Sequence, residues 1–192
     1  YNLTFRNIIT GNNSDAGIDI KGDNVLIENV VSFGNTNNFK TWGNNITIRN
    51  CLSYQSKDQW TDGNLTYSTG ITVRDGVTTI ENSTFADNQA TDVKVAPDYA
   101  GKLIIKNSII ASQYTYRSLS ERYNTFIESD NVWYKKGVAT APFTLGSGSI
   151  WADPQFKKEF GDREISLADF TTLFIPTTGK IALNTPNNDQ AL

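Results

Sequence analysis

A short phrase recurs along this chain: an apolar position, any residue, a second apolar residue, any residue, and then an asparagine. The copies lie 21 to 32 residues apart, a period typical of proteins built from stacked repeats. Five copies end at Asn7, Asn29, Asn50, Asn82 and Asn107, and a weaker sixth copy is expected to end at Asn131. The repeat therefore constrains the fold more than any other feature of the sequence.

Each copy is followed by two further short segments with strand-like alternation, bounded by Gly, Asn, Ser and Asp. Three strands per repeat predict an all-β fold, a right-handed parallel β-helix in which each coil stacks on the one before. The recurring asparagines would form a column at one corner, where Asn tolerates left-handed backbone. The third segments of successive coils are expected at Gly17–Ile20, Asn38–Thr41, Gly70–Val73 and Asp92–Val95.

The pattern also predicts the domain organisation. Residues 1–192 are expected to form one β-helix domain, which begins in mid-pattern and would lack its N-terminal coils. Residues 1–113 carry the regular coils. Residues 114–192, where the phrase fades and aromatic residues gather, are expected to complete the last coils and cap the end of the solenoid.

Composition excludes several classes of function. The chain has no histidine and one cysteine, which removes histidine-dependent triads, histidine-ligated zinc and an internal disulfide. The net charge is −3, and the lack of a basic stripe argues against a nucleic-acid partner. No apolar run reaches the roughly 18 residues that suggest a membrane span. We expect a monomer, and we expect Cys51 to be a small side chain that is buried or half-buried.

Stacking of the third segments predicts a column of outward side chains. It would contain Asp19, Lys40, Thr72 and Lys94, one from each coil, about 4.8 Å apart. Asp19 and Lys40 would be neighbours on consecutive coils, with Asp15 at the corner before the same strand. Such a pair is often only a surface ion pair of little energetic value.

The repeat that ends at Asn82 is about ten residues longer than its neighbours. The extra length should form a loop near Lys40, and loops on a rigid scaffold are common sites of function. Trp60 and Tyr67 from this loop could form an aromatic wall that contacts a sugar. Arg74 and Lys94 would lie near the same groove and could hold an anionic substrate.

The segment Asn35–Gly43, followed by Ile46–Tyr54, resembles polysaccharide lyase family 9. That family has an Asn-Gly-Phe-Lys-type phrase before a similar strand, and Lys40 occupies the position of the lysine. Upstream, Asp15-Ala16-Gly17-Ile18-Asp19 resembles the family's Asp-Asp-Gly-aromatic-Asp phrase, with Ala16 in place of the middle acid.

The resemblance implies β-elimination of a uronate-containing polysaccharide of the pectate or rhamnogalacturonan type. Lys40 would be the catalytic base, and Asp15 and Asp19 would bind Ca²⁺, which neutralises the substrate carboxylate. A further calcium ligand of the family would fall at or before Tyr1. An acidic polysaccharide as partner also implies a secreted, periplasmic or cell-surface protein.

Two other functions remain open on sequence grounds. A non-catalytic carbohydrate-binding or adhesive β-helix would use aromatic residues such as Trp60, Tyr67, Tyr99 and Tyr114 to stack on sugars. A glycoside hydrolase would need two suitably spaced carboxylates, for which Asp58, Asp62, Asp75 and Asp92 are available.

Overall fold

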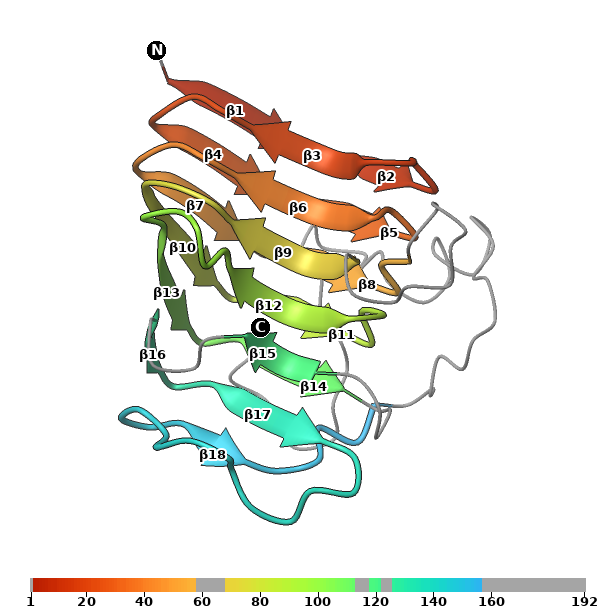
Figure 1. Cartoon of the computed structure of the whole chain (residues 1–192), viewed down its shortest axis with the longest axis vertical. Helices are drawn as coiled ribbons and strands as arrows, with labels where there is room; N and C mark the ends of the chain where they lie inside the picture. The colour runs from red at the N-terminus through yellow and green to blue at the C-terminus, as the bar shows by residue number, and fades with distance from the viewer. Residues whose placement is uncertain (1, 58–67, 113–117, 122–125, 157–192) are drawn as a thin grey trace.

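The computed structural model describes residues 2–57, 68–112, 118–121 and 126–156. The chain folds as an all-β parallel solenoid in which each coil up to residue 121 adds one strand to each of three sheets, and the strands that follow extend two of these sheets (Figure 1). The paired strands of the described residues run parallel to one another, and these residues contain no helix. The predicted β-helix with three strands per coil is therefore confirmed. No helix long and apolar enough to span a membrane occurs in this part of the chain.

Each sheet collects the equivalent strands of successive coils. The first sheet contains β1 (Leu3–Arg6), β4 (Val25–Glu28), β7 (Ile46–Arg49), β10 (Val77–Glu81), β13 (Lys102–Lys106) and β16 (Phe126–Ser129). The second contains β2 (Ile9–Gly11), β5 (Val31–Phe33), β8 (Leu52–Tyr54), β11 (Thr84–Ala86), β14 (Ile109–Ser112), β17 (Val132–Lys135) and β18 (Ile150–Trp151). The third contains β3 (Ala16–Ile20), β6 (Asn37–Thr41), β9 (Thr69–Val73), β12 (Thr91–Val95) and β15 (Ser118–Glu121).

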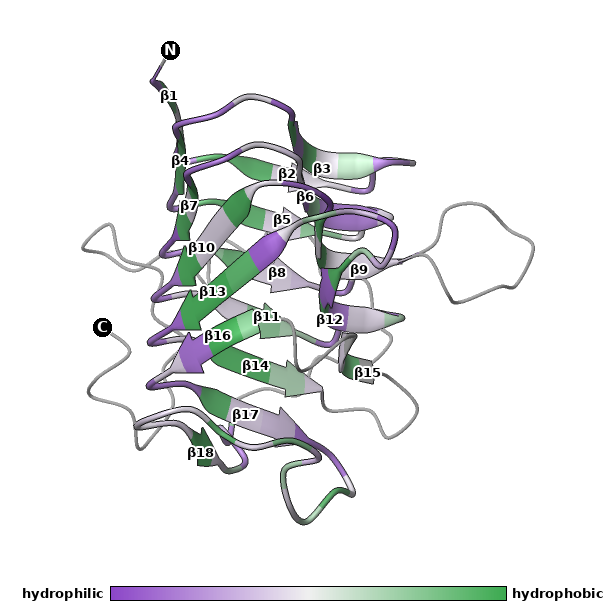
Figure 2. Ribbon diagram, turned by 60° about the vertical axis from the view of Figure 1, so that its left-hand side comes forward, coloured by the Kyte–Doolittle hydropathy of each residue, from purple (hydrophilic) through white to green (hydrophobic). Residues whose placement is uncertain are grey.

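The core consists of apolar columns that run along the solenoid axis. In the first sheet the register aligns Ile27, Ile48, Ile80 and Ile105, and none of the four is exposed. The other two sheets supply the columns Phe39–Ile71–Val93 and Phe85–Ile110–Trp133. Apolar segments accordingly recur within each coil, between polar corners (Figure 2). Burial of this surface is the main favourable contribution to folding.

The predicted asparagine corner is confirmed by backbone geometry. All five asparagines that end the phrase have φ between 47° and 58°, the left-handed region that Asn tolerates better than most residues. Asn29 Nδ2 donates to Asn7 Oδ1 at 3.2 Å. The sixth position was predicted wrongly, because β13 pairs with β16 so that Asp130, with φ 55°, follows Asn107 in the column.

Asn131 belongs instead to a neighbouring column of side chains that accept hydrogen bonds from the backbone. The Cys51 N–H donates to Ser83 Oγ at 3.0 Å, and the Ser83 N–H donates to Ser108 Oγ at 3.2 Å. The Ser108 N–H donates to Asn131 Oδ1 at 2.8 Å, and the Asn131 N–H donates to Ser149 Oγ at 2.9 Å. The column thus satisfies backbone donors at a corner that lies between two sheets.

Cys51 itself is buried, as predicted, with 1% of its surface exposed. Burial raises the pKa of its thiol to about 12, because the thiolate would lose its hydration inside the solenoid. The sulfur donates to the Arg49 carbonyl at 3.2 Å. Cys51 is therefore a small, protonated packing residue.

Charges of alternating sign cross the outer face of the first sheet from coil to coil. Glu28 forms ion pairs with Arg6 at 2.7 Å and with Arg49 at 2.8 Å. Glu81 lies 3.6 Å from Arg49 and 3.1 Å from Lys106. Partial burial raises the pKa of Glu28, but the two arginines outweigh this and hold it below its usual value. Each cation of this column therefore has a carboxylate partner.

Glu128 connects the last coils through hydrogen bonds. Its Oε1 accepts the N–H of Gly146, and its Oε2 accepts hydrogen bonds from Asn131, Trp133 and Ser149. Partial burial alone would raise the pKa of Glu128, but these hydrogen bonds prevail and lower it. A group whose pKa is lowered by folding stabilises the protein above its unfolded-state pKa and loses that contribution as pH falls through the folded value.

Glu128→Gln should therefore lower the free energy of unfolding by about 1–2 kcal/mol at neutral pH, because an amide cannot accept all four hydrogen bonds. Urea unfolding at pH 7 and in steps from pH 5 to pH 3 measures this. The variant should also lose less stability than the wild type in the acid range. Asp98→Asn, at an exposed turn residue, is the matched control. Equal urea midpoints for Glu128→Gln and the wild type at pH 7 would contradict a stabilising role for the hydrogen bonds of Glu128.

Candidate functional site

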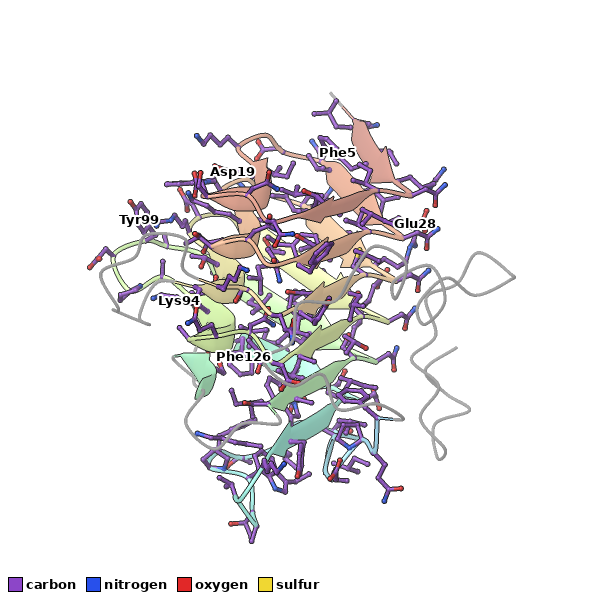
Figure 3. All side chains as sticks on the ribbon, turned by 90° about the vertical axis from the view of Figure 1, so that its right-hand side faces the viewer. Phe5, Asp19, Glu28, Lys94, Tyr99 and Phe126 are labelled. Carbon is purple, nitrogen blue, oxygen red and sulfur yellow. The ribbon has the colours of Figure 1, made fainter. Side chains whose placement is uncertain are left out.

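The outer face of the third sheet carries the column that the sequence predicted. The register pairs Asp19 with Lys40, Lys40 with Thr72, and Thr72 with Lys94. The neighbours Ile18, Phe39, Ile71 and Val93 point into the core, so alternation turns the column residues outward. Figure 3 shows Asp19 and Lys94 on one side of the solenoid and Glu28 on the other.

Lys40 is the centre of a small charged cluster. Its Nζ lies 3.4 Å from Asp15 Oδ1 and 3.8 Å from Asp19 Oδ2. The lysine side chain is only 14% exposed, whereas that of Asp15 is 69% exposed. Lys21 also reaches Asp19, at 3.8 Å. The amine is thus partly sheltered and oriented, and the carboxylate of Asp15 remains open to solvent.

Trp42 joins this cluster to the next coil, a role that was not predicted. Its Nε1 donates to Asp19 Oδ1 at 2.9 Å. The ring lies 5.9 Å from Lys21 Nζ, 5.9 Å from Lys40 Nζ and 5.0 Å from Arg74 Cζ. Trp42 follows Lys40 by two residues, so it points to the same face; this alternation is the signal that could have found it.

Arg74 lies between two aromatic rings. Its guanidinium carbon is 5.0 Å from the centroid of Trp42 and 5.1 Å from that of Tyr99. The two rings meet edge to face, with centroids 5.4 Å apart and an interplanar angle of 83°. Tyr99 comes from the turn between β12 and β13 and is 41% exposed. Arg74 and Lys94 are the predicted substrate-binding residues that the structure describes, and of these two Arg74 lies in the cluster around Lys40 and Trp42.

The lower half of the predicted column does not belong to this cluster. Thr72 is 3% exposed, and its hydroxyl bonds with Thr69 at 2.7 Å and with Asn37 Oδ1 at 2.9 Å. Lys94 lies two strands from Lys40, about 10 Å along the sheet. The predicted residues Trp60 and Tyr67 lie outside the described residues, as do Tyr114 and the expected cap after residue 156.

Two of the four carboxylates considered for a hydrolase lie in the described part of the chain, and neither is placed for that role. Asp75 Oδ1 accepts the N–H of Gly76 at 2.8 Å, and Gly76 has φ 64°, so this dipeptide forms a turn. Asp92 is fully buried and accepts hydrogen bonds from Asn88. Asp58 and Asp62 lie outside the described residues.

The carboxylates predicted to bind Ca²⁺ do not by themselves fit that ion. Calcium takes six to eight oxygen ligands, and Asp15 and Asp19 supply at most four. Both also contact the Lys40 ammonium, which lies where a cation between them would bind. The described residues contain no group of three or more acidic, histidine or cysteine side chains suited to a metal. Calcium at this site stays a prediction.

Comparison of the chain with family models, with curated proteins and with solved structures found no match. The solenoid fold rests on the structure, and the resemblance to polysaccharide lyase family 9 stays a hypothesis.

Competition between Lys40 and metal gives a direct test. The wild-type chain should bind Ca²⁺ more weakly than about 1 mM, the weak end of protein calcium sites. Lys40→Ala should tighten binding several-fold, because it removes the cation that the two carboxylates now hold. Calorimetric titration with CaCl₂ measures both, with Lys102→Ala as a control for the lost charge. Micromolar binding to the wild type would contradict this view of the site.

Proposed function

We propose that this protein acts on a uronate-containing polysaccharide, which binds across the outer face of the third sheet and is cleaved by β-elimination. The observation that carries the proposal is the position of Lys40. It lies on an outward row of a rigid sheet, one strand from Asp19, partly sheltered, and within reach of an aromatic ring.

The composition of the face supports an acidic saccharide as substrate. Lys21, Lys40 and Arg74 surround Trp42, while Asp15 and Asp19 are the carboxylates that contact Lys40. Aromatic rings contact the apolar faces of sugars, and cations attract carboxylates along the same chain. A polymer binds to an open face more readily than to a closed pocket, and an extended sheet surface offers such a face.

The chemistry proposed for Lys40 is proton abstraction. The lysine nitrogen takes the proton from the uronate carbon next to the carboxylate. The electron pair left behind forms a carbon–carbon double bond as the glycosidic oxygen leaves the neighbouring carbon and takes up a proton from water. The amine must be neutral to accept that proton, and a carboxylate next to the reacting carbon needs nearby positive charge to stabilise the anion that develops. Lys21 and Arg74, which contact the same Trp42 ring as Lys40, could supply this positive charge.

A second candidate is a non-catalytic acidic-glycan-binding protein. The observation that favours it is the pair of contacts from Lys40 to Asp15 and Asp19. A lysine in these ion pairs can attract an anionic ligand without any proton transfer. Either function is expected outside the cytoplasm, where such polymers occur, and in a monomer.

One assay separates the two candidates. The wild-type chain is incubated with polygalacturonate and rhamnogalacturonan, with calcium or with chelator, and ultraviolet absorbance reports the unsaturated product. Lys40→Ala should reduce the rate about 10²- to 10⁴-fold, the usual contribution of a general base, because a methyl group cannot accept the proton. Lys102→Ala removes an exposed lysine of the first sheet and should leave the rate unchanged.

The outcomes point in different directions. Unsaturated product that survives Lys40→Ala would reject Lys40 as the base. Binding of the polymer without any new double bond would favour the non-catalytic candidate. Saturated fragments would instead indicate hydrolysis.

A further inference from the structure

Arg74 differs from the arginines on the first sheet in what it contacts. Arg6 and Arg49 both form ion pairs with Glu28. Arg74 has no carboxylate partner among the described residues, and its side-chain contacts there are with the rings of Trp42 and Tyr99. The cation lies on the same face as Lys40, on the following coil.

The two rings hold the guanidinium in place and shield part of it from water. Its Nε is buried and has no hydrogen-bond partner in the described part of the chain. A buried donor without a partner is unfavourable, and a bound acceptor would remove this cost. The rings also restrict the side chain before any ligand arrives, which reduces the entropy lost on binding.

We propose that Arg74 is the anion-recognition residue of this face, and that it binds a substrate carboxylate through the N–H edge of its guanidinium. The planar fork of an arginine matches the two oxygens of a carboxylate, whereas lysine offers only a point charge. The inference rests on the proposed function for the identity of the ligand, a uronate. In this proposal the charge of the substrate carboxylate is neutralised by Arg74, and not only by Ca²⁺ bound to Asp15 and Asp19.

The geometry places this subsite beside the proposed base. Trp42 contacts both cations, with Lys40 Nζ at 5.9 Å and Arg74 Cζ at 5.0 Å from its ring centroid. In the sheet, Arg74 is one strand and two residues from Lys40, about 8 Å between backbones. One saccharide chain lying across Trp42 can therefore meet both groups, with one uronate carboxylate at Arg74.

Arg74→Lys tests the inference because it keeps the charge and removes the fork. Binding is measured by calorimetry in the Lys40→Ala background, which leaves the polymer intact. The probes are polygalacturonate (carboxylates only), dextran sulfate (sulfates only) and neutral dextran. Arg74→Lys should weaken polygalacturonate binding about tenfold or more. Arg49→Lys, the same change on the first sheet, should leave it unchanged, and thermal unfolding checks that both variants fold.

The results separate this inference from the proposed function. Equal affinity of Arg74→Lys and its parent for polygalacturonate would overturn the inference, and Lys40-dependent product would then still support the lyase. Failure of both polyanions to bind would also overturn it. A third outcome is that dextran sulfate alone binds in an Arg74-dependent way and polygalacturonate gives no unsaturated product. This outcome would support an anion site at Arg74 but would reject a uronate as its ligand.

Discussion

The structure depends on one constraint: successive coils hydrogen-bond in register, so that equivalent residues stack. A shift of one residue would turn every inward side chain to the outside. Left-handed asparagines at the first corner keep the coils aligned, and apolar columns such as Ile27–Ile48–Ile80–Ile105 gain their burial only in this register. Single residues of each coil thereby become continuous rows, and a row of outward residues is a surface that no one coil could build.

The same register gives the first and third sheets different outer faces. On the first sheet, Arg6, Arg49 and Lys106 alternate with Glu28 and Glu81, so each cation meets an acid. Such contacts between coils contribute little individually, but they give each of these three cations an acidic partner. On the third sheet, aromatic rings take the place of acids around Arg74. That difference in partners is the reason to place function on the third sheet.

The sequence predicted what depends on alternation and repeat length. The three strands of each coil, the asparagine corner and the pairing of Asp19 with Lys40 all follow from counting residues, and the structure confirms them. The sixth corner was misplaced because an Asp replaces Asn there, and a pattern of letters cannot show that Asp130 adopts the same backbone.

Contacts made by turns could not be predicted. Tyr99 reaches Arg74 from the turn between β12 and β13, and no spacing rule fixes how such a turn folds back. The hydrogen bonds that gather on Glu128 likewise join residues up to 21 positions apart, across segments with no repeat pattern. The structure gives the positions of Lys40, Asp15 and Asp19. Their chemical roles depend on a ligand, and these roles are therefore proposed.

We propose that the outer face of the third sheet holds an acidic saccharide across Trp42, between Lys40 and Arg74. A crystal structure of the Lys40→Ala variant soaked with a short oligogalacturonate tests it most directly. We expect a saccharide over Trp42, with one carboxylate on the Arg74 guanidinium and the acidic carbon–hydrogen bond directed at the position of the missing amine. A saccharide bound on the first or second sheet, with the third sheet empty, would contradict it.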